Sequence, residues 1–114
     1  MPPKSNPLKL NPLQLRTLAL LQEIARIPDF ATPLPESGGY KITQLPHAHG
    51  DHFHIGNKVA SSKDATGLTN PAVWAALQRK GLTEGDYPYA VTLTKAAMDY
   101  DTSEAGHLVH GGDH

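Results

Sequence analysis

The stretch that decides the fold is ATGLTNPAVWAALQRKGLTEGDYPYAVTLTKAA, residues 65–97. Residues 61–69 predict a short helix that ends at Gly67, because glycine accepts the backbone angles of a sharp turn between helices. A second helix is predicted over residues 70–80, where Asn70 can serve as the N-cap and Pro71 takes the first helical position. The stretch therefore predicts two helices joined by a tight turn.

The residues that follow the second helix predict a helix end, a strand and a further helix. Gly81 follows the second helix at the position where a left-handed residue is preferred. After the acidic turn at residues 84–88, the alternating residues 89–93 predict a strand. Thr94 can then cap a short final helix that runs through Met98 and Tyr100.

This order resembles the second half of a winged-helix domain. The matching features are the Ala65-Thr66-Gly67-Leu68 turn, the exit Lys80-Gly81-Leu82, a wing and a returning strand. The spacing lets Val73 and Leu77 pack against Leu68 beneath the turn. The resemblance implies a helix–turn–helix module that binds DNA or protein. The chain also resembles small bacterial proteins that carry HAHG.HFHIG before DATGLTNPAVW, a resemblance that implies no activity.

The first half of the domain reads as one helix and two strands. A helix is predicted over residues 11–27, with Asn11 and Gln14 forming a capping box and Pro28 ending it. The connector 28–39 holds three prolines and two glycines, so it cannot form a central strand. Strands are predicted at 40–45 and 53–60, although Gly56-Asn57 can mark a tight turn within the second.

These elements predict the fold class α+β, a small winged-helix-like domain of three or four helices with a small antiparallel sheet. The domain spans residues 11–102. Residues 1–10 read as a mobile proline-containing tail, and residues 103–114 as a loosely ordered histidine-containing tail.

Composition excludes several classes of protein. The chain has 114 residues, which is enough for one small domain with a core. It has no cysteine, which excludes disulfide scaffolds, thiol catalysis and Cys-ligated zinc or iron–sulfur clusters. The longest apolar run, Leu18–Leu21, is too short to span a membrane, and MPPKSNPLKL lacks a signal core. We expect a cytoplasmic protein with no membrane partner.

The charge balance favours a protein partner over DNA. Lys and Arg number 10 and Asp and Glu number 11, for a net charge of −1. The N-terminal half of the second helix, from which a reading helix contacts bases, has almost no side-chain donors. We expect a protein partner or self-association, with DNA as the other option. The residues predicted to contact DNA or a partner are Asn70, Gln78, Arg79, Lys80, Lys63 and Lys58.

Catalysis has no support in the residue pattern. No P-loop, G-x-G-x-x-G or G-x-S-x-G motif occurs, and Ser61 and Ser62 have no evident base placed beside them. Trp74 and the tyrosines could form an aromatic binding surface, but Trp74 at a helix edge more often completes a core. We therefore predict a protein that binds without catalysing a reaction and needs no cofactor.

The histidines suggest an alternative function, metal binding. All seven lie in two clusters, His47, His49, His52 and His54 in one and His107, His110 and His114 in the other. An extended chain places His52 and His54 on one face, and a hairpin brings all four of the first cluster close together with Asp51. Three or four imidazoles can hold zinc or a similar metal. The competing interpretation is surface histidines on a turn.

Residues 47–52, HAHGDH, are similar to the H-x-H-x-D-H loop of metallo-β-lactamase-like hydrolases, whose residues bind zinc and activate water. That fold is larger than one domain of this size and needs ligands from distant strands. Hydrolase chemistry therefore ranks below simple metal binding.

Overall fold

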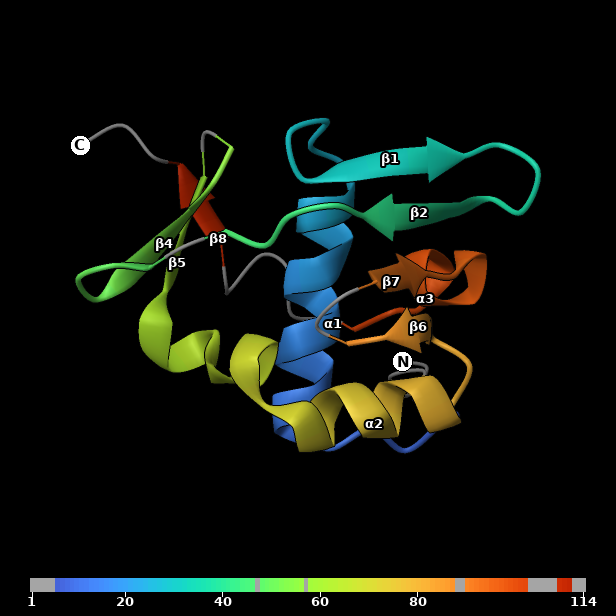
Figure 1. The fold of residues 1–114 in the computed structure, drawn as a ribbon. Helices are drawn as coiled ribbons and strands as arrows, with labels where there is room; N and C mark the ends of the chain where they lie inside the picture. The colour runs from blue at the N-terminus through green and yellow to red at the C-terminus, as the bar shows by residue number, and fades with distance from the viewer. Residues whose placement is uncertain (1–5, 47, 57, 88–89, 103–108, 112–114) are drawn as a thin grey trace, which may run out of the picture.

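One helix runs through the middle of the molecule, with a small antiparallel sheet on either side (Figure 1). This arrangement is seen in a computed structural model, which describes residues 6–46, 48–56, 58–87, 90–102 and 109–111. The predicted α+β class is confirmed. The prediction of a single sheet is wrong, because the described residues form two sheets of four strands each.

The central helix, α1 (Pro12–Ala25), begins with the predicted capping box. The Asn11 side chain accepts from the Gln14 backbone N–H at 2.8 Å, and the Gln14 side chain accepts from the Asn11 N–H at 3.0 Å. Much of the helix surface is buried, because helices and strands pack around it. Its buried residues are Thr17, Leu18, Ala19, Leu20, Leu21, Gln22, Ile24 and Ala25.

The first sheet has the order β1-β2-β7-β6. Its strands are β1 (Ala31–Leu34), β2 (Gly39–Ile42), β7 (Ala90–Leu93) and β6 (Thr83–Asp86). Strand β1 lies in the segment read as a connector, and its edge position tolerates Pro33 because half of the N–H groups of an edge strand face away from the ladder. Strand β2 ends before the predicted residue 45, since the N–H groups of Thr43 and Gln44 both donate to Phe30 O.

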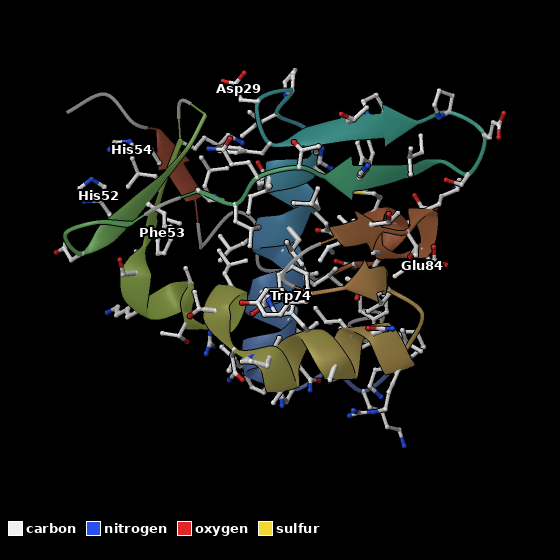
Figure 2. All side chains as sticks on the ribbon, in the orientation of Figure 1. Asp29, His52, Phe53, His54, Trp74 and Glu84 are labelled. Atoms are coloured by element: carbon white, nitrogen blue, oxygen red, sulfur yellow. The ribbon has the colours of Figure 1, made fainter. Side chains whose placement is uncertain are left out.

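The second sheet has the order β3-β4-β5-β8. Its strands are β3 (Ala48–His49), β4 (His52–Ile55), β5 (Lys58–Ser61) and β8 (Val109–Gly111). The segment 53–60, predicted as a strand, is a hairpin, and the tight-turn alternative is confirmed by Gly56, whose φ is +64°. Phe53 alternates with His52 and His54, which places it on the opposite face of β4 (Figure 2).

The helix predicted at residues 61–69 is instead two 3₁₀ turns, η1 (Ser62–Asp64) and η2 (Thr66–Thr69). Gly67 lies inside η2 rather than ending a helix, and it does not have a positive φ. A Cβ atom at Gly67 would lie 1.8 Å from Thr17 Oγ1 on α1. The glycine is therefore needed for the close approach of η2 to α1.

The remaining helices follow their predicted caps. Helix α2 (Pro71–Arg79) has Asn70 as its N-cap, and Gly81 beyond its end has a φ of +77°. Helix α3 (Lys95–Asp99) has Thr94 as its N-cap, whose side chain accepts from the Ala97 N–H at 3.2 Å. It ends before the predicted Tyr100, which is its C-cap. The predicted packing of α2 against η2 is confirmed by the burial of Leu68, Val73 and Leu77.

Parts of both predicted tails pack against the domain. Leu10 is 4% exposed, and the Leu8 N–H donates to Tyr100 Oη at 3.1 Å. At the other end, β8 pairs with β5 along the register Val59↔His110. Residues 1–5, 103–108 and 112–114 of these tails lie outside the described residues.

We expect Asn70→Ala to lower the free energy of unfolding by about 1 kcal/mol, because the Ala72 N–H loses its capping acceptor at 3.0 Å. Gln78→Ala, at an exposed position on the same helix, should change it by less than about 0.5 kcal/mol. Urea denaturation followed by circular dichroism measures both values. Equal stability of the two variants would contradict the capping role.

Candidate functional site

The outward side of the first two turns of α2 carries small apolar residues. Pro71, Ala72 and Ala75 are exposed there, while Trp74 on the inward side is buried. Asn70 begins the helix, and its amide oxygen is engaged by the cap. This face is therefore an exposed apolar surface with almost no side-chain donors.

Trp74 and Tyr87 join this helix to the connection between β6 and β7. Their rings stack with centroids 4.7 Å apart and planes inclined by 15°. Trp74 Nε1 donates to Leu68 O at 2.9 Å, and Tyr87 Oη donates to the same oxygen at 3.2 Å. Both polar groups are engaged within the domain, which confirms Trp74 as part of the core (Figure 2).

A shallow groove lies between α2 and β6. It is lined by Pro71, Trp74, Ala75, Gln78, Gly85 and Tyr87. None of these side chains is charged. Gly85 and Tyr87 enter the groove only because β6 lies beside α2 in the fold, and no local sequence signal marks them as part of it.

The six residues predicted to contact DNA or a partner do not form one patch. Gln78 and Arg79 are exposed in the last turn of α2, and Lys80 is its C-cap. Lys63 lies on η1 and Lys58 on β5, both beyond the other end of α2 (Figure 1).

The charge of Lys58 is already paired within the domain. Its Nζ lies 2.8 Å from Glu23 Oε1, and the other oxygen of that carboxylate lies 2.9 Å from Arg26 Nη1. Lys58 therefore already forms an ion pair with a carboxylate of α1.

A second candidate surface is the outer face of β4. His52 and His54 share this face, as their spacing predicted, and their Nε2 atoms are 3.2 Å apart. The rings meet edge to face, with centroids 4.8 Å apart and planes at 81°. Asp51 Oδ1 lies 3.3 Å from His52 Nδ1. The structure thus brings three of the predicted cluster residues together.

The other histidines are placed by the backbone alone or not at all. His49 on β3 is the register partner of His52, and His110 on β8 is the partner of Val59. His47, His107 and His114 lie outside the described residues. Within the described part of the chain, no group of three or more His, Asp or Glu side chains surrounds a common point suited to a metal ion.

No helix in the described ranges has the length and apolar character to cross a membrane. Comparisons of the chain with protein-family models, curated proteins and solved structures find no significant match.

Proposed function

We propose that this chain is a non-catalytic, winged-helix-like binding domain whose partner is a protein, in the first instance a second copy of itself. The observation that carries the proposal is the exposed, uncharged surface of Pro71, Ala72 and Ala75 beside the α2–β6 groove. The order of elements supports the winged-helix likeness. Helix α2 packs on η2 and α1 and leads into β6 and β7, and β7 pairs with the earlier strand β2.

A protein partner suits this surface better than DNA. A reading helix contacts base edges from its N-terminal half, where donors and acceptors are required. Here that half presents the small apolar residues, and the cations Arg79 and Lys80 lie at the other end. The net charge of −1 adds no general attraction for phosphates. The buried centre of a protein–protein interface is depleted of charged residues, which suits this uncharged surface.

The proposal predicts that Ala75→Glu weakens self-association. Sedimentation velocity from low micromolar to several hundred micromolar protein should show a concentration-dependent dimer for the wild type and a monomer for A75E. The control is Ala96→Glu, which places the same charge at an exposed position on α3 and should behave as the wild type. A wild-type protein that stays monomeric throughout would overturn self-association.

Fluorescence anisotropy of a labelled mixed-sequence duplex, titrated with the protein, tests DNA as the alternative partner. We expect a flat titration even at low salt. Binding that fades steeply as salt rises would instead assign the domain to DNA, because such binding rests on neutralised phosphates. Arg79→Ala and Lys80→Ala would then reduce the salt dependence, whereas A75E would weaken binding by adding a like charge.

A further inference from the structure

We propose that residues 6–9 form a strap that opens and closes over Tyr100 while the rest of the domain stays folded. The strap precedes α1, and Leu10 is its root. Leu10 is 4% exposed, whereas Pro7 and Lys9 are exposed, so the burial that holds this segment is concentrated at its root. This conformational device goes beyond the proposed partner binding, because none of its residues belongs to the α2 surface.

A hydrogen-bond network around the Tyr100 hydroxyl, the latch, holds the strap closed. The hydroxyl accepts from the Leu8 N–H at 3.1 Å and donates to the side-chain oxygen of Asn6. That oxygen also accepts from the Leu10 N–H at 3.1 Å, and Asn6 Nδ2 donates to Leu10 O at 3.1 Å. All of these bonds are only partly buried, so water can take the place of each partner when the strap opens.

Tyr100 is held in place by contacts that do not involve the strap. It is the C-cap of α3, and its N–H donates to Ala97 O at 3.3 Å. Gln22, which is 6% exposed on α1, donates from Nε2 to both Ala97 O and Tyr100 O at 2.8 Å. Opening of the strap therefore leaves the junction of α1 with α3 intact.

The backbone at Lys9 favours the open form. Its φ of +56° is the one positive value among the non-glycine residues of the described ranges. The left-handed conformation disfavours an L-residue by a factor of about 5–30. The closed strap imposes it, because the Lys9 N–H donates to Asn6 O at 3.0 Å within the turn that returns Leu10 to Asn6. The closed form therefore holds strain that the open form releases.

The strap gives the domain two forms at equilibrium. In the closed form the Tyr100 hydroxyl is occupied by the chain itself, and in the open form it is available to another group. A ligand that binds only one of these forms shifts the balance between them. The competing explanation is that residues 6–9 are an integral part of the fold and open only when the whole domain unfolds.

Amide hydrogen exchange of the full chain, followed by nuclear magnetic resonance, separates these explanations. The reporters are the Leu8 and Leu10 N–H groups, which bond to the latch, and amides in the buried middle of α1 report global unfolding. We expect Leu8 and Leu10 to exchange through one shared opening, with protection well below that of α1. Added denaturant should change this exchange little, because a local opening exposes little surface.

Two variants should move this exchange in opposite directions. Tyr100→Phe keeps the ring but removes both bonds of the hydroxyl, so exchange of Leu8 and Leu10 should accelerate by roughly tenfold or more. Lys9→Gly removes the steric cost of the positive φ and should slow exchange by about threefold, since the freedom of glycine in the open form offsets part of the gain. Exchange of the α1 amides should stay near the wild-type rate in both variants.

Lys9→Ala is the matched control. It removes the same side chain as Lys9→Gly but keeps the strained backbone, so its exchange should stay within about twofold of the wild type. Exchange of Leu8 and Leu10 with the protection and denaturant dependence of α1 would show that the segment opens only with the whole domain. That result, a lack of protection at both amides, or equal rates in Lys9→Gly and Lys9→Ala would overturn the proposal.

Discussion

Gly67→Ala is expected to destabilise the domain by roughly 3 kcal/mol, the upper part of the usual range for overpacking a core. The new Cβ atom would lie 1.8 Å from Thr17 Oγ1 and 3.1 Å from Thr17 Cβ. Thr17 is fully buried on α1, and its hydroxyl donates to Leu13 O at 2.8 Å. The hydroxyl therefore cannot rotate away without losing this hydrogen bond, and the Thr17 Cβ would still be in close contact, so η2 would have to shift. Chemical denaturation of the variant measures the loss.

Removing the obstructing atoms should restore much of this stability. In the double variant Thr17→Ala/Gly67→Ala, the hydroxyl is absent and the closest remaining contact is with the Cβ of residue 17. The double variant should be more stable than the sum of the two single changes predicts, since the two residues are in direct contact. Additive effects would show that the clash is not the cause of the destabilisation.

Trp74→Ala should destabilise the domain by about 3–5 kcal/mol, as expected for removal of a large buried aromatic side chain. Trp74 is 2% exposed, and it links three parts of the fold. Its ring belongs to α2, stacks on Tyr87 beyond β6, and donates a hydrogen bond to Leu68 in η2. The change removes all of these contacts at once. Urea denaturation followed by far-ultraviolet circular dichroism measures it, because the variant has no tryptophan fluorescence.

Tyr87→Phe is the matched comparison for this prediction. It removes only the hydroxyl that donates to Leu68 O, and this oxygen keeps its hydrogen bond from Trp74. We expect a loss of about 1 kcal/mol. If Trp74→Ala costs no more than Tyr87→Phe, the indole does not anchor α2 as the geometry indicates.

The candidate sites were predictable from sequence to different degrees. Alternation along an extended strand was enough to place His52 and His54 on one face, and this expectation is confirmed. The uncharged start of α2 was also readable from Asn70, Pro71 and Ala72. The groove was not, because Gly85 and Tyr87 meet α2 only through the pairing of β6 and β7. Likewise, the ion pair of Lys58 with Glu23 joins residues 35 positions apart.

The sequence by itself determined where the three α-helices begin and how α2 ends. The caps at Asn11, Asn70 and Thr94 and the left-handed glycine at position 81 depend on atoms within a few residues of each other. Tertiary structure alone decided that β1 and β8 are strands. An edge strand forms only where a neighbouring strand is available for backbone hydrogen bonding. It also decided the role of Gly67, whose essential neighbour, Thr17, lies 50 residues earlier on α1. Local hydrogen bonds are encoded by neighbouring residues, whereas strand pairing and close packing depend on partners that only the folded chain brings together.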